Sequence, residues 1–300
     1  MPSSPRNAGI EKASAMTWFT SQPDQGPTLC FPDKEKSCFA CCPPIRPADY
    51  EHIQHRTIIQ RMLRENTRAF DSQDRKARPI TGFSCWALGY LDDVCGLVGC
   101  LLHPARNQGA DFRFLTEYGE KCRRESCPES RVFLELSVQA RRFWLTMADG
   151  LDSFQYSSKR VNPLFRLLGW GSSLLEAIAM EEGGQPFSRH RLSRHYPVLE
   201  SEVEPRANAY LLNHIRLQQG VEFLGRDSFA RRFEQFSAGL MARLKKVPSN
   251  DAAPFTHLLP LDPLFLDLLR LGAGIRRVRK ESAVTLKEEV DTALSSFEAD

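Results

Sequence analysis

The chain after Ser130 has the hydrophobic pattern of helices. Apolar residues recur there every three or four positions, which places them on one face of a helix. The clearest stripe consists of Phe229, Phe233, Phe236, Leu240 and Leu244. A capping residue followed by proline, the usual beginning of a helix, occurs at Asn162-Pro163 and Asp262-Pro263. The pattern predicts roughly five to seven helices, packed as a bundle over residues 129–300.

The chain before residue 128 has a different pattern. Four prolines between Cys30 and Pro47 exclude a regular helix there. One helix is expected after Asp49, with an apolar face of Tyr50, Ile53, Ile58, Met62 and Phe70. Short strands or irregular segments are expected over residues 81–104. Residues 1–28 predict an extended arm that docks through Trp18 and Phe19.

These patterns define three parts of the chain. We expect an N-terminal arm at 1–28, a cysteine-cluster metal-binding domain at 29–128 and a helical domain at 129–300. The fold class is therefore mainly α, with an irregular cysteine-rich metal-binding module followed by a helical bundle. Hydrophobic residues make up 42% of the 300 positions and charged residues 26%, as in folded proteins.

The net charge of +3 gives no electrostatic signature for nucleic acid or an anionic membrane, so neither is expected as a partner. The two most apolar stretches, 164–180 and 258–271, contain charged residues and predict core helices. No apolar secretory segment follows the first residues, so we expect a cytoplasmic protein with reduced thiols.

The nine cysteines are unevenly distributed, because all of them lie between Cys30 and Cys127. Cys38 and Cys41 have the CxxC spacing with which one loop wraps a metal, and Cys42 follows directly. Neighbouring side chains diverge, so Cys41 and Cys42 either face two metal sites or only one of them is a ligand. Eight thiols match two four-thiolate sites: Cys38, Cys41, Cys42, Cys85, Cys95, Cys100, Cys122 and Cys127.

Such thiolates predict zinc or an iron–sulfur cluster as the cofactor, because both prefer soft sulfur ligands. His103 could replace one thiolate, although an ordinary partly buried histidine is the simpler interpretation. Reduced cysteines without a shared role are the main alternative. A thioredoxin-like pair is not favoured, because the surrounding sequence has no βαβ pattern.

The cysteine motifs resemble the YkgJ-like cysteine-cluster family, described as zinc- or iron-chelating domains and sometimes as iron–sulfur proteins. The resemblance covers residues 30–128. It is carried by Cys38-Phe39-Ala40-Cys41-Cys42, then Cys85, Leu91-Asp92-Asp93, Cys95 and Cys100-Leu101-Leu102-His103-Pro104. It implies metal ligation by Cys38, Cys41, Cys42, Cys85, Cys95 and Cys100. Glu35 stands where the family often has a further cysteine, and Cys122 with Cys127 forms an additional pair.

Three functions follow from these observations. The first is a metal-binding protein with a structural or redox role, whose helical domain could bind a protein partner. The second is a metal-dependent enzyme, such as a protein methylase-like activity known in the wider cysteine-cluster group. The third is a structural zinc module on a helical adaptor. His52 with His55, and the basic runs at 189–195 and 276–280, are interpreted as solvated surface.

Overall fold

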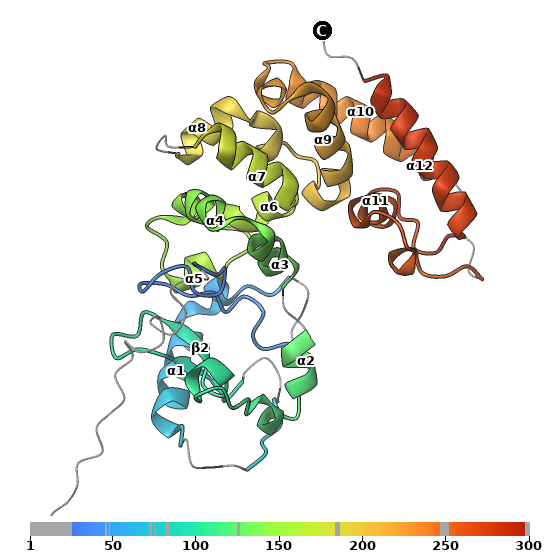
Figure 1. Ribbon diagram of the computed structural model, residues 1–300. Coiled ribbons are helices and arrows are strands. Elements are labelled where there is room, and N and C mark those ends of the chain that lie inside the picture. Colours follow the sequence, from blue (N-terminus) through green and yellow to red (C-terminus); the bar gives the residue numbers. More distant parts are fainter. Residues whose placement is uncertain are drawn as a thin grey trace, which may run out of the picture. The chain divides into compact units, whose positions relative to one another are not determined.

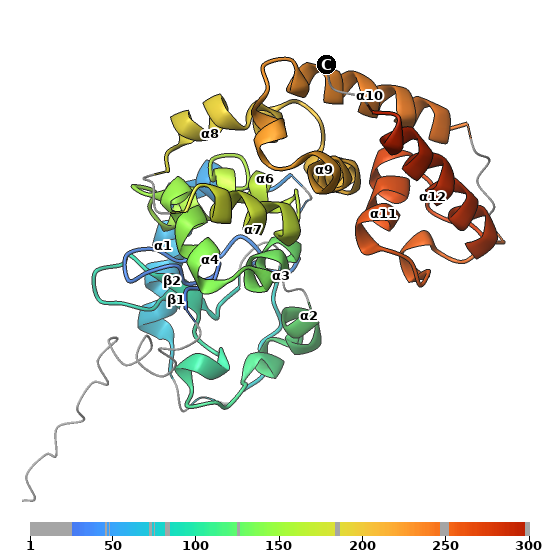
Figure 2. The same cartoon turned by 45° about the horizontal axis from the view of Figure 1, so that its top comes forward.

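The structure is a computed structural model, shown in Figures 1 and 2. It describes residues 26–45, 47, 49–71, 74, 76–81, 85–124, 127–183, 187–246 and 252–297. The predicted docking residues of the N-terminal arm, Trp18 and Phe19, lie outside this set. The described part is mainly helical with one small two-stranded sheet, as expected for the fold class. None of its helices has the length and apolar character needed to cross a membrane.

The chain divides into two compact units. Unit 1 comprises Met1–Ser126 together with Asp152–Ser158, and unit 2 comprises Cys127–Leu151 with Lys159–Asp300. The segment 152–158 therefore belongs to the cysteine-rich unit, although the residues before and after it in the sequence belong to unit 2.

Unit 1 consists of short elements joined by long connections. Its regular parts are η3 (His52–His55), α1 (Arg56–Ala69), β1 (Leu88–Tyr90), β2 (Val98–Cys100), η4 (Pro104–Arg106), η5 (Arg113–Thr116), α2 (Gly119–Arg124) and α5 (Ser153–Tyr156). β1 and β2 form an antiparallel hairpin, in which Leu88 pairs with Cys100 and Tyr90 with Val98. The irregular loop and the strand-like pieces expected from the sequence are thus present.

Helix α1 uses the predicted face only in part, because Met62 and Phe70 pack partly buried against the core whereas Ile58 does not. The structure has a turn of 3₁₀ helix, η3, before α1 begins at Arg56. That turn has three residues rather than 3.6, so it changes the phase of the following helix. As a result Ile59 and Leu63 are buried, whereas Ile58 is 62% exposed.

Unit 2 is helical, with shorter and more numerous helices than predicted. They are α3 (Pro128–Glu135), α4 (Val138–Leu145), α6 (Pro163–Leu168), α7 (Ser172–Glu181), α8 (Arg189–His195), α9 (Pro205–Gln219), α10 (Phe229–Leu244), α11 (Pro263–Asp267) and α12 (Lys280–Ser295). Ser137 lies between α3 and α4 and caps α4, because its side chain accepts a hydrogen bond from the Ala140 N–H. Gly171 lies between α6 and α7 and has a φ of 89°. A residue with a side chain would be strained in this backbone conformation.

The predicted caps and the apolar stripe of unit 2 are confirmed. Asn162 and Asp262 accept hydrogen bonds from the first turns of α6 and α11, and proline follows each cap. In α10, Phe229, Phe233, Leu240 and Leu244 are buried. The core also contains the indoles of Trp144 and Trp170, whose N–H groups donate to backbone carbonyls at 3.0 and 3.2 Å. Buried indoles usually have such a partner.

Candidate metal centre

The loop that contains Cys38, Cys41 and Cys42 is fixed by buried hydroxyl groups. Ser37 has no exposed surface, and its hydroxyl donates to the Val98 carbonyl at 2.8 Å and accepts from the Val98 N–H at 2.7 Å. The Phe39 N–H donates to Ser157 Oγ at 2.9 Å. The loop thus has the ordering contacts that its prolines prevent a helix from supplying.

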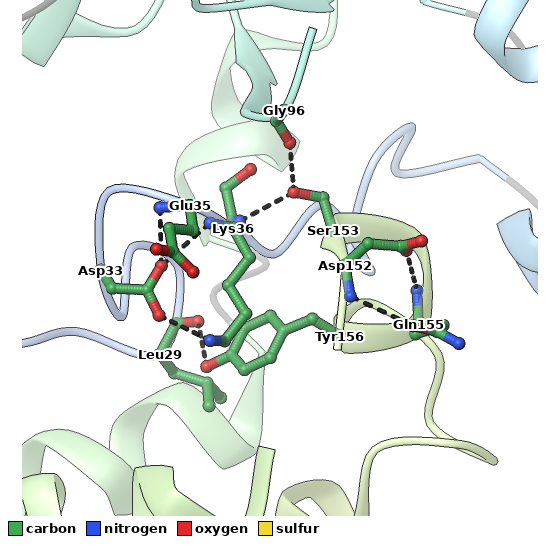
Figure 3. Close-up of polar contacts among 10 residues, drawn as sticks. Leu29, Asp33, Glu35, Lys36, Gly96, Asp152, Ser153, Gln155 and Tyr156 are labelled. Atoms are coloured by element: carbon green, nitrogen blue, oxygen red, sulfur yellow. Dashed lines mark hydrogen bonds and ion pairs between the residues drawn. The ribbon is translucent and has the colours of Figure 1, made fainter. Parts of the chain in front are cut away.

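Segment 152–158 supports this loop from the other side. In α5, Ser153 Oγ accepts from the Ser37 N–H at 3.0 Å and donates to the Gly96 carbonyl at 2.5 Å. The Tyr156 hydroxyl donates to the Leu29 carbonyl at 3.1 Å. Figure 3 shows Ser153 and Tyr156 pointing from α5 toward the loop and the hairpin turn. A capping box at Asp152 and Gln155 begins α5 and positions these side chains.

The hairpin of β1 and β2 positions the thiols of Cys85 and Cys100. Asp92 closes its turn by accepting from the N–H groups of Gly96 and Leu97. The N–H of Leu88 donates to the Cys85 carbonyl at 3.0 Å, and Leu88 pairs with Cys100. Cys85 and Cys100 therefore both lie at the open end of the hairpin. Asn66 of α1 holds this end by donating to the carbonyls of Cys85 and Leu88, at 2.9 and 2.8 Å.

Helix α2 contributes a further thiol, Cys122. The helix packs closely on η5, because a Cβ added at Gly119 would lie 2.7 Å from the Cα of Phe114. The Cys122 N–H donates to the carbonyl of Tyr118 at 2.8 Å. Tyr118 and Phe112 pack against the same apolar core as Cys42, Cys85 and Cys100. The close approach at Gly119 thus directs Cys122 toward this core.

Five thiols from three segments come together here, and we call them the thiol cluster: Cys41, Cys42, Cys85, Cys100 and Cys122. The pKa of Cys42 is raised well above its ordinary value by a hydrogen bond with Cys41, by burial and by the nearby thiols of Cys41, Cys100 and Cys85. Burial raises the pKa of Cys85 to about 11 and that of Cys100 to about 12, and the thiol of Cys122 adds to both shifts. Each thiol therefore lies within the electrostatic range of others.

Within the described residues, no three or more His, Cys, Asp or Glu side chains are arranged closely enough to hold a metal ion. The cluster is thus a neighbourhood of thiols rather than a closed set of ligands. Its chemistry nevertheless fits zinc or an iron–sulfur cluster, because all five donors are sulfur atoms. Since the raised pKa values of Cys42, Cys85 and Cys100 keep these three thiols protonated, a metal would have to displace their protons on binding.

Cys38 and Cys30 lie side by side in the same loop region. The Cys38 N–H donates to the Cys30 carbonyl at 2.8 Å, and both residues are partly buried. Cys30 is not among the eight predicted ligands, yet the fold brings it next to the first cysteine of the CxxC pair.

Cys95 is separated from the thiol cluster by the length of the hairpin. It is exposed and lies in the turn with a φ of 58°, whereas Cys85 and Cys100 lie at the open end. Three strand residues correspond to about 10 Å, beyond the reach of one tetrahedral site. The structure therefore does not group Cys95 with Cys85 and Cys100.

Cys127 belongs to unit 2 and begins helix α3. Its sulfur accepts from the Ser130 N–H at 3.4 Å, and its thiol donates to Glu129 Oε2 at 3.0 Å. Lys159 Nζ lies 2.8 Å from the other oxygen of Glu129. Burial, and then the charge of Glu129, raise the pKa of Cys127. A helix cap with a retained proton is a sufficient structural role for this thiol.

The histidines and basic runs differ partly from expectation. His52, interpreted as solvated, is only 4% exposed and packs edge-on against Phe39 at 4.7 Å between ring centroids. His103 is partly buried, and burial lowers its pKa.

The basic run at 189–195 forms helix α8. Its Arg191 and His195 pair with the buried carboxylate of Glu182, at 2.7 and 2.9 Å. Positive charge in this run is therefore balanced within unit 2.

Sequence reasoning missed the groups that position the thiols, namely Ser37, Asn66, Ser153 and Ser157. Only the capping box at Asp152 and Gln155 was a local signal, and it indicates a helix start rather than a contact with a distant loop. Comparison with models of protein families, with curated proteins and with solved structures finds no match to this chain. The resemblance to the YkgJ-like family therefore stays a prediction.

Proposed function

We propose that the thiol cluster binds a thiophilic metal centre, either a zinc ion or an iron–sulfur cluster, and that this binding orders unit 1. The observation that supports this most is the convergence of five thiols from three segments beside one apolar core. Isolated core cysteines would have no reason to gather. Four thiolates complete one zinc site or one cluster, so the grouping favours one centre over the two predicted from the count.

The arrangement also favours a centre that forms with the fold. Buried thiols with raised pKa values bind metal only after losing protons, and the binding free energy then contributes to folding. The partly buried position of Cys41, Cys42, Cys100 and Cys122 leaves the site near the surface, where a metal can enter. Unit 2 would serve as the scaffold or partner-binding part of such a protein.

The test is to purify the full chain without oxygen and measure zinc, iron and acid-labile sulfide per chain. We expect either about one zinc in a colourless protein, or iron and sulfide with visible absorption. Cys42→Ser should lose most of the metal, while Cys30→Ser, a matched change in the same loop region, should retain it. A folded protein without metal, or equal loss in both variants, would contradict the proposal.

A further inference from the structure

Unit 2 contains a cavity of about 430 Å³, and every described residue that lines it belongs to this unit. Its walls come from α3, the turn between α6 and α7, the N-terminal half of α9, and α11. The volume falls within the range of small-molecule sites, roughly 300–1,000 Å³, and equals that of roughly fourteen water molecules. The cavity is therefore large enough for a small organic molecule.

The surface of this cavity is mainly apolar. Val132 of α3, Leu168 of α6 and Leu264 of α11 contribute to it. Gly171 has no side chain, and a Cβ added there would lie 3.7 Å from Cδ2 of Leu264. The turn between α6 and α7 therefore leaves room beside Leu264. Walls of this kind bind the apolar body of a ligand, because the body leaves water when it enters.

One positive charge beside the cavity has no counter-ion. Asp267 pairs with two arginines, with Arg206 Nη2 at 2.7 Å from Oδ2 and Arg270 Nη2 at 2.6 Å from Oδ1. Neither arginine forms an ion pair with a second carboxylate among the described residues. Two guanidinium groups thus share one carboxylate, and the group of three carries a net charge of one.

Arg206 is the member of this group that a ligand can reach. It lines the cavity and its side chain is 37% exposed, whereas Arg270 is not among the described lining residues. The stem of Arg206 lies against the end of α6, because a Cβ added at Gly169 would be 3.5 Å from Arg206 Cγ. Asp267 contacts Nη2, so the donors on Nε and Nη1 are available to a carboxylate.

The other charged residues of the wall are largely balanced by their neighbours. Glu129 lies 2.8 Å from Lys159 Nζ. Glu135 accepts a hydrogen bond from Ser172 Oγ at 2.6 Å and follows Arg131 by four residues on α3, a spacing at which opposite charges attract. The charge at Arg206 is therefore the one that selects the charge of a ligand.

We propose that this cavity binds a small monocarboxylate with an apolar body, and that Arg206 holds the carboxylate while Arg270 neutralises Asp267. A single negative charge matches the single cation without a counter-ion, and arginine binds carboxylates in a two-pronged geometry. The volume limits the ligand to roughly a dozen non-hydrogen atoms. This inference is independent of the proposed metal binding, because all the residues involved belong to unit 2.

The experiment is titration calorimetry of the full reduced chain with hydrocinnamate, a phenyl ring joined by two carbons to a carboxylate, and with its neutral amide. The two probes have the same shape and differ in charge. We expect a Kd on the order of 0.1 mM for hydrocinnamate, and at least about tenfold weaker binding of the amide. Equal affinity for the two probes, or no binding of either up to about 2 mM, would overturn the proposal.

Substitutions in the charged group predict effects of opposite sign. Arg206→Gln should weaken the binding of hydrocinnamate about tenfold, because it removes the anchor. Arg270→Gln should weaken it about threefold, since Asp267 then opposes the charge of Arg206 alone. Asp267→Asn should strengthen it about threefold, because it removes the competing carboxylate. Weaker binding by a folded Asp267→Asn variant would overturn the assigned role of Arg206.

Arg216 provides the matched control on the same helix. Its Nη2 donates to Ser173 and Asn213, two neutral residues of the wall, at 2.7 and 2.5 Å. Arg216→Gln removes the same charge as Arg206→Gln and should change the affinity less than about twofold. A larger loss in Arg216→Gln than in Arg206→Gln would contradict the proposal. If the variants do not fold, the comparison of hydrocinnamate with its amide on the wild type decides alone.

Discussion

Unit 1 and unit 2 are held together in different ways. In unit 2, helices bury large apolar side chains such as Trp144, Trp170 and Phe233, and their ends have side-chain or backbone caps. Unit 1 also has an apolar core, but its irregular segments are fixed by single polar contacts, such as those of Ser37 with Val98 and of Asn66 with Cys85. Apolar burial is spread over many residues, whereas each polar contact in unit 1 fixes one particular segment. The stability of unit 1 should therefore depend far more on individual groups and on a bound metal.

The largest difference between the two units is expected when metal is removed. We expect a chelator to increase amide hydrogen exchange in β1, β2 and α2 by at least about a hundredfold, because binding free energy is folding free energy in such sites. Exchange in α9 and α10 should change less than about twofold. Peptide-resolved exchange of the full chain, with and without chelator, is the measurement. Equal effects in both units would remove the distinction between them.

The next largest effect is expected at Ser37. Ser37→Ala removes two hydrogen bonds and leaves the N–H and carbonyl of Val98 without their partner in a buried position, at a cost of about 2 kcal/mol. The control is Ser295→Ala, at an exposed hydroxyl on α12 that donates to the Asp291 carbonyl. It should cost less than about 0.5 kcal/mol. Amide hydrogen exchange measures the loss of stability of unit 1 in Ser37→Ala and of unit 2 in Ser295→Ala. Comparable losses in the two variants would show that unit 1 does not depend on Ser37.

The smallest effect concerns the pH dependence of unit 2. Since the pKa of Cys127 is raised in the folded state, its contribution to stability is complete below the ordinary value of 9.0 and is lost as pH rises above it. Cys127→Ser retains a good helix cap without a titratable thiol. Above pH 9 the wild type should lose stability relative to the variant by up to about 1.4 kcal/mol per pH unit. Urea unfolding at pH 7–10 measures this, and parallel pH profiles would contradict it.

The sequence predicted the parts of the fold that depend on local pattern. The stripe of α10 and the caps Asn162 and Asp262 depend on residues within one helix, so their spacing was sufficient. The predicted face of α1 was right for Met62 and Phe70 but wrong for Ile58, because a 3₁₀ turn precedes the helix and changes its phase. The contact of Ser157 with the N–H of Phe39 joins positions 118 residues apart, and no local pattern encodes such a contact.

The sequence identified the cysteines as candidate ligands but not how the fold arranges them. Five of the eight predicted ligands lie near one another beside one core, and metal binding by any of them stays a prediction. Spacing could not show that the hairpin register separates Cys95 from Cys100, or that Cys127 caps a helix in the other unit. The metal and its ligands stay predictions.

The most direct test of metal binding by the thiol cluster is the metal content of two single variants, Cys100→Ser and Cys95→Ser. Both residues lie on the same hairpin, so the two changes differ mainly in position: Cys100 is at the open end and Cys95 in the turn. In anaerobically purified full chain, Cys100→Ser should contain less than about a tenth of the wild-type metal, while Cys95→Ser retains nearly all of it. Equal loss in the two variants, or loss in Cys95→Ser alone, would contradict the proposed centre.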